Sequence, residues 1–215
     1  MSAPADPGET LKRILRLQQK GRLAEAAALA GKLAKRFSAD ARLLNLTATL
    51  ALQAGNAEDA AALFERSLAI NPAQPQAQSN RAVALERLGR LDEALDACDK
   101  AVALQPNYAK AHANRGNLLN ALGRSQDALA ASDRALALDP NMIEATVNRG
   151  NALRSLGRAE EALAAFDAAL AQAPNLAALH LDRGNTLHDL GRDEEAIAAF
   201  DRTLALAPDD ADAFT

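Results

Sequence analysis

The sequence is poor in aromatic residues: it contains no Trp, one Tyr and five Phe, so aromatics make up 3% of its 215 residues. Its hydrophobic content of 49% is nevertheless enough for a core. That core must be built from Ala and Leu, and this composition favours helices. The single cysteine, Cys98, excludes an internal disulfide, and we expect it to be a small buried hydrophobe.

The chain also lacks a surplus of basic residues and a long apolar run. Its net charge of −4 argues against bulk binding of nucleic acid, which needs a basic footprint. No apolar run approaches the roughly 18 residues of a membrane span. Residues 1–10 lack the basic start and the apolar stretch of a signal peptide. We therefore expect a disordered lead-in over 1–10 and a cytoplasmic protein without a membrane partner.

Sequence motifs of catalysis are missing as well. His112, His180 and His188 do not have the spacing of metal ligands, because no pair of them is three or four residues apart. There is no phosphate-binding loop and no nucleophile elbow. The sequence therefore predicts a protein that is not an enzyme and that has no metal and no cofactor.

What the chain has instead is a period of 34 residues. Glycine returns at this step at Gly21, Gly55, Gly89, Gly123, Gly157 and Gly191. Alanine follows each of these glycines five residues later, and proline keeps the same step at Pro72, Pro106, Pro140, Pro174 and Pro208. A fixed period of this length indicates one supersecondary unit that is repeated and stacked, because a single unit cannot bury its apolar face alone.

Numbering each repeat from 1 to 34, with the proline at position 32, divides the chain into regular units. The predicted repeats are 41–74, 75–108, 109–142, 143–176 and 177–210, with a degenerate repeat at 7–40 and a truncated one at 211–215. Together they form a single array over 11–215.

Each repeat reads as two antiparallel helices. In 143–176 the apolar residues recur at helical spacing on both sides of Gly157. Glycine can adopt the left-handed conformation that ends a helix, and Pro174 ends the second helix. The residues after the prolines are predicted N-caps of the following first helices, and they are Asn107, Asn141, Asn175 and Asp209.

Three further patterns predict contacts between helices. Gly150 at position 8, like Gly116 and Gly184, should face the alanine at position 20, and Ser132 takes the place of a bulky Phe at position 24. Position 7 carries Arg and position 25 carries Asp in the same four repeats. This co-occurrence predicts an ion pair that links helices, although a row of Arg for an acidic partner is the alternative. Arg158 and its equivalents follow the glycine, where a cation complements a helix C-terminus.

These residues resemble the tetratricopeptide repeat. That family has a small residue at 8, Gly at 15, Ala at 20, an aromatic at 24, Ala at 27 and Pro at 32, and the match covers roughly residues 10–215. The resemblance implies an all-α fold, a right-handed α-solenoid of stacked antiparallel helix pairs. It also implies a protein-binding module. Stretches such as AHANRGNLLNALGR look like bacterial arrays that often precede a glycosyltransferase domain of the O-linked N-acetylglucosamine transferase or SPINDLY kind.

The resemblance further implies that the first helices line a concave groove, with positions 2, 5, 6, 9, 12 and 13 pointing into it. Amide and charged side chains at these positions are the candidate peptide-binding residues: Asn80, Asn114, Asn117, Asn120, Asn148, Asn151, Arg154, Asp182, Asn185 and His188. An amide both donates and accepts hydrogen bonds, so a ladder of them can pair with the backbone of an extended peptide. Polar residues on an open helix face also occur without any ligand.

Two functions therefore stay open at this point. One is a non-catalytic scaffold that binds a protein or peptide segment in the groove. The other is the substrate-recognition region of a glycosyltransferase whose catalytic domain lies outside this sequence. The last repeat adds a third expectation. Ile197, Phe200 and Leu204 would lack part of their cover, and Phe214 could cover only a little of them. We therefore expect a chain that continues or that self-associates through this end.

Overall fold

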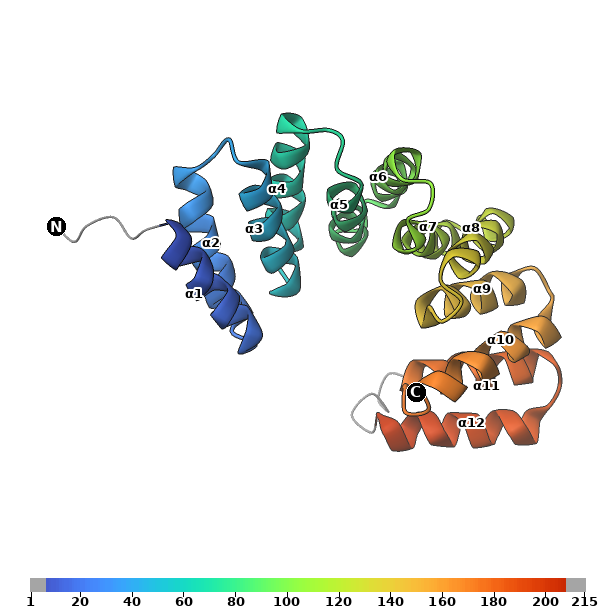
Figure 1. The fold of residues 1–215 in the computed structure, drawn as a ribbon. Coiled ribbons are helices and arrows are strands. Elements are labelled where there is room, and N and C mark those ends of the chain that lie inside the picture. The colour runs from blue at the N-terminus through green and yellow to red at the C-terminus, as the bar shows by residue number, and fades with distance from the viewer. Residues whose placement is uncertain (1–6, 208–215) are drawn as a thin grey trace. The chain divides into compact units, whose positions relative to one another are not determined.

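A computed structural model describes residues 7–207, which form helices joined by short loops (Figure 1). The helices are α1 (Pro7–Gln19), α2 (Leu23–Arg36), α3 (Ala41–Gln53), α4 (Ala57–Ile70), α5 (Pro75–Arg87), α6 (Leu91–Leu104), α7 (Ala109–Ala121), α8 (Ser125–Leu138), α9 (Ile143–Ser155), α10 (Ala159–Gln172), α11 (Ala177–Asp189) and α12 (Asp193–Leu206). No strand occurs among these residues. The predicted all-α fold of consecutive helix pairs is confirmed.

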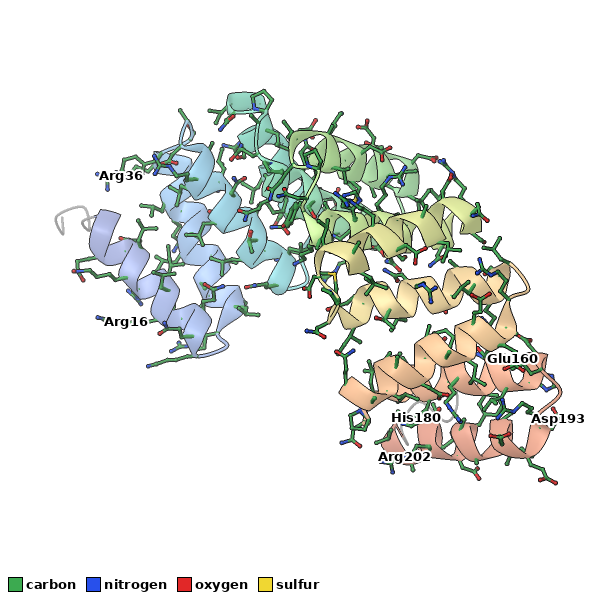
Figure 2. The ribbon with its side chains drawn as sticks, turned by 45° about the vertical axis from the view of Figure 1, so that its right-hand side comes forward. Arg16, Arg36, Glu160, His180, Asp193 and Arg202 are labelled. Carbon is green, nitrogen blue, oxygen red and sulfur yellow. The ribbon has the colours of Figure 1, made fainter. Side chains whose placement is uncertain are left out.

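The described chain divides into two compact units, one up to Pro106 and one from Asn107. Within each unit, consecutive helices pack as pairs and each pair packs on the next. In the second unit, Glu160 and Asp193 near the starts of α10 and α12 lie at one end, whereas His180 and Arg202 lie at the other (Figure 2). The second helices of these two repeats therefore run in the same direction.

The turn inside each repeat follows from its glycine. All six of these glycines have a φ between +70° and +88°, which is the left-handed region. At the end of α9, Gly157 N donates to Arg154 O and Arg158 N donates to Leu153 O, both at 2.9 Å. This is the Schellman arrangement, which satisfies carbonyls that the helix leaves open. Glycine occupies the position because other residues rarely adopt this conformation.

The predicted asparagine caps are wrong. The first helices begin at Ala109, Ile143 and Ala177, two residues after the asparagines, and their N-cap residues offer no side-chain hydrogen bond. Asp40 does cap α3, where its carboxylate accepts from the backbone N–H groups of Arg42 and Leu43. The prediction for Asp209 lies outside the described residues.

The core lies between the two helices of each pair and between neighbouring pairs. The alanine at position 20 is fully buried in five repeats and 2% exposed in the sixth, at Ala196. Cys98 is buried, as expected. The nearest neighbour of the glycine at position 8 is the residue at position 24, although Gly116 also lies close to Ala128 at position 20, as predicted. A Cβ on Gly150 would lie 2.8 Å from the ring of Phe166, and one on Gly184 would lie 2.5 Å from Phe200. These glycines make room for the ring at position 24.

Charged pairs connect successive repeats. Arg149 Nε donates to Asp133 Oδ1 at 2.7 Å, and Arg183 Nε donates to Asp167 Oδ1 at 2.6 Å. Each pair joins a first helix to the second helix of the preceding repeat. The predicted ion pair therefore forms in these two cases, but between repeats. The expected role of the Arg158 charge at the preceding helix end stays a prediction, but its side chain has a partner in the next helix. It donates two hydrogen bonds to the carboxylate of Glu161 at the start of α10.

Repeat 109–142 has a small buried serine where other repeats have the Phe ring. Ser132 is fully buried, and its Oγ lies 2.7 Å from the place that a Cβ on Gly116 would occupy. Its hydroxyl donates to Ala128 O of the same helix. Because the small serine side chain already lies against Gly116 and α7 packs at least as closely on α8 as in the pairs that contain Phe, little space is left for a larger side chain.

Replacing Ser132 by Phe should therefore lower the free energy of unfolding by about 1–3 kcal/mol, because a ring overpacks this site. Ser132→Ala is the matched control and should stay within about 1 kcal/mol, because the hydroxyl bonds only within its own helix. Urea unfolding followed by circular dichroism measures both. Stabilisation by Ser132→Phe would contradict the packing described above.

Candidate functional site

The unit from Asn107 contains a groove of about 570 Å³ along its first helices. Helices α7, α9 and α11 supply most of its lining, and the loops before α9 and α11 supply the rest. The lining residues are Ala113, Asn114, Asn117, Asn141, Ile143, Glu144, Val147, Asn148, Ala173, Leu176, Ala178, Leu179 and Asp182. Because the helices repeat at a step of 34 residues, the same helix positions come together from successive repeats.

Four of the predicted site residues line this groove, namely Asn114, Asn117, Asn148 and Asp182. They occupy positions 6 and 9, which share one face of a helix. Asn80 belongs to the unit that ends at Pro106, and it is not among the residues that line this groove. The remaining predicted residues lie outside the lining, and they are Asn120, Asn151, Arg154, Asn185 and His188.

Part of the predicted amide ladder holds the repeats together. Asn148 is 7% exposed, and its Nδ2 donates to Ala113 O at 3.0 Å. Asn120 Nδ2 donates in turn to Asn148 O at 2.8 Å, and its Oδ1 is buried without a partner. These two hydrogen bonds link α7 to α9. The amide hydrogens that make them are therefore engaged within the fold.

The other predicted residues have separate surroundings. Arg154 Nη1 lies 3.7 Å from Asp189 Oδ2, and His188 Nδ1 lies 3.0 Å from Asp193 Oδ1. Asn151 is half-buried on α9. Asn185 lines a smaller apolar hollow of about 350 Å³ near the end of α12.

Several lining residues were not among the predicted site residues. Ile143, Glu144 and Val147 occupy positions 1, 2 and 5 of their repeat, and positions 2 and 5 share the groove face, so the helical period could have identified Glu144 and Val147. Leu176 lies in the loop after α10 and keeps 47% of its surface exposed. Loop residues have no helical period, which is why the sequence did not point to it.

The ionisable residues that line the groove are both acids, Glu144 and Asp182. Burial removes water from the Asp182 carboxyl and raises its pKa above the ordinary value, while the positive charge of Arg154 acts in the opposite direction. Neither carboxylate makes a hydrogen bond or salt bridge to another residue of the described chain. The groove therefore combines an apolar lining with amides and with two acids whose carboxylates have no hydrogen bond or salt bridge within the described chain.

The expected apolar surface on the last helix pair is present in part. Ile197 is 60% exposed and Leu204 is 39% exposed, and Phe200 and Leu204 line the hollow that also contains Asn185. Phe214 lies outside the described residues. Self-association through this surface stays a prediction.

No metal-binding group of three His, Cys, Asp or Glu residues occurs within the described range 7–207. The helices found there are too short or too polar to cross a membrane.

The family models that match the chain all describe the same repeat. Models of the tetratricopeptide repeat match residues 11–75, 46–109, 114–177 and 147–211, and a second model of the same repeat matches 97–130. Among curated protein sequences, none matches the chain.

Solved structures of the same repeat class resemble the whole fold. A tetratricopeptide repeat protein from Parabacteroides merdae is 19% identical with a TM-score of 0.76, and the match covers 92% of this chain and 78% of that one. A thermophilic repeat protein from Thermus thermophilus is 27% identical with a TM-score of 0.67, over 84% and 98%. YrrB, described as a repeat protein with an unusual peptide-binding site, is 24% identical with a TM-score of 0.64, over 84% and 93%.

Two asparagines on α9 should differ in their effect on stability. Asn148→Ala should lower the free energy of unfolding by about 0.5–1.5 kcal/mol, because the hydrogen bond that joins α9 to Ala113 O of α7 is lost. Asn151→Ala, three residues away on the same helix, should change it by less than about 0.5 kcal/mol. Urea unfolding of the two variants measures this difference, and equal values would refute a structural role for the Asn148 amide.

Removing the charge of Asp182 should stabilise the protein at neutral pH. Its folded-state pKa is raised above the usual value of 3.8, so the folded protein holds the proton more tightly, and stability falls as the pH rises through that pKa. Asp182→Asn should raise the free energy of unfolding at pH 7 and lose this advantage below about pH 4. Unfolding curves at both pH values test the sign. A variant less stable than the parent at pH 7 would show that the carboxylate has a stabilising partner.

Proposed function

The chain belongs to the tetratricopeptide repeat family, and we propose that it is a non-catalytic scaffold whose second unit binds an extended segment of a partner protein in the groove along α7, α9 and α11. Proteins of this family bind protein or peptide partners. The family models that match describe an interaction repeat and indicate no catalytic family.

The observation that carries the proposal is the composition of the groove. Its volume of about 570 Å³ lies in the range of pockets that enclose a ligand. Aliphatic side chains line it together with polar side chains that include Asn114, Asn117 and Asn141. Peptide recognition needs this combination, because apolar pockets take side chains while polar groups position the backbone.

The similarity to YrrB supports the class of ligand only. That protein is described as having a peptide-binding site. At 24% identity, however, the similarity concerns the fold alone and does not transfer the site to this chain. The expectations of a bacterial source, of the cytoplasm and of a link to a glycosyltransferase stay predictions. So does the expectation that the chain avoids nucleic acid, which rests on its net charge of −4.

Blocking the groove should weaken peptide binding. Ala178 and Ala164 are both exposed alanines in helices of the second unit, but only Ala178 lines the groove. Peptides selected from a displayed random library on the parent chain should bind Ala178→Trp more weakly by about tenfold or more, because the indole fills the groove. They should bind Ala164→Trp with unchanged affinity. Fluorescence anisotropy with synthetic copies of the selected peptides measures both.

Two results would count against this function. One is equal binding of every selected peptide to the parent and to Ala178→Trp, which would place the binding surface elsewhere. The other is a library that yields no enriched peptide on the parent chain. Circular dichroism of both Trp variants checks that each keeps the helical content of the parent.

A further inference from the structure

The groove has a distinct apolar part on α9 and α11. Ile143 and Val147 lie one turn apart on α9, and Leu179 and the half-exposed Leu176 come from the start of the next repeat. An aliphatic side chain of a ligand that lies here would cover Leu176. Removing such apolar surface from water is favourable, so this part of the groove selects an aliphatic residue.

The groove also has negative charge that the chain itself does not balance. Glu144 lies one residue after Ile143, and Asp182 lies three residues after Leu179, so each acid adjoins the apolar part. Arg154 is the cation that acts on Asp182, but it lies outside the lining and within 3.7 Å of Asp189. No Lys, Arg or His lines the groove.

A partly buried carboxylate without a hydrogen-bond donor is costly, and a ligand that supplies a donor with positive charge compensates it. Backbone N–H groups of a peptide could serve as donors, but they carry no charge. Lysine and arginine side chains provide both. They also have long aliphatic stems that can lie along apolar surface while the charged group reaches an acid.

We propose that the groove selects segments in which a lysine or arginine lies next to an aliphatic residue, with the cation bound by Glu144 and Asp182 and the aliphatic side chain packed against Val147 and Leu176. This selectivity rests on the function proposed above. In it the two acids recognise the charge of the segment, and Val147 and Leu176 recognise its aliphatic side chain.

The selected peptides test the charge preference directly. Those that lose binding on Ala178→Trp should carry Lys or Arg beside Leu, Ile or Val. Changing that cation to Gln should weaken binding to the parent chain about tenfold. The same change should have an effect of about twofold or less on the double variant Glu144→Gln, Asp182→Asn, because the acids that recognise the cation are then neutral.

A matched control separates this local effect from the loss of net charge. Glu160→Gln with Asp201→Asn also removes one Glu and one Asp, both exposed and both outside the groove lining. Glu160 lies near the start of α10, at the end of that helix away from Ala173. In this control the change of the cation to Gln should still weaken binding about tenfold.

The outcomes distinguish the two proposals. Peptides that depend on the groove but carry no cation, or whose cation matters equally in the double variant and the parent, would overturn the selectivity and leave the scaffold function intact. The absence of any peptide sensitive to Ala178→Trp would overturn the scaffold function and the selectivity with it.

Discussion

The left-handed conformation of one glycine in each repeat is the constraint on which the rest of the structure depends. With φ between +70° and +88° at all six positions, the first helix always ends two residues before the glycine and the second always begins two residues after it. In every repeat from α3 onward the first helix has 13 residues and the second has 14. Because the lengths do not vary, equivalent positions stack, and residues 34 apart in the sequence lie on the same surface within each unit. The groove is a direct consequence of this regularity.

Position 6 of the first helices shows how the choice of one residue changes the groove. In α9 the Asn148 amide donates to Ala113 O of the neighbouring first helix, while the residue also lines the groove. At the same position the following repeat has Asp182. Its carboxylate cannot donate a hydrogen bond in the same way, and it adds a negative charge to the groove lining.

The sequence predicted the fold well because the residues that end its helices recur with a fixed period. Glycine and proline fix the helix ends, and the structure has its first helices at the predicted steps of 34 residues. The asparagine caps failed because the loop continues one residue further, through Tyr108, Met142 and Leu176, before the helix begins. For the site, the helical face predicted Asn114, Asn117, Asn148 and Asp182 as neighbours. It did not predict Leu176, which reaches the groove from a loop, or the buried contact of Asn148 with a carbonyl, which depends on the spacing of adjacent helices.

The charged pairs between repeats show which forces hold the stack. In the second unit, Arg149 and Arg183 bind acids of the preceding repeat. In the first unit the equivalent positions of α2 and α3 hold Gly31 and Thr47, and both line a hollow of about 520 Å³. The interface between α2 and α3 persists without the pair, through a core that includes Leu33, Leu43 and Leu44. Exposed ion pairs contribute about 0–1 kcal/mol, whereas burial of one leucine contributes about 1.5–3 kcal/mol. Apolar contact therefore holds the repeats together, and the arginine pairs add geometric preference to an interface that already exists.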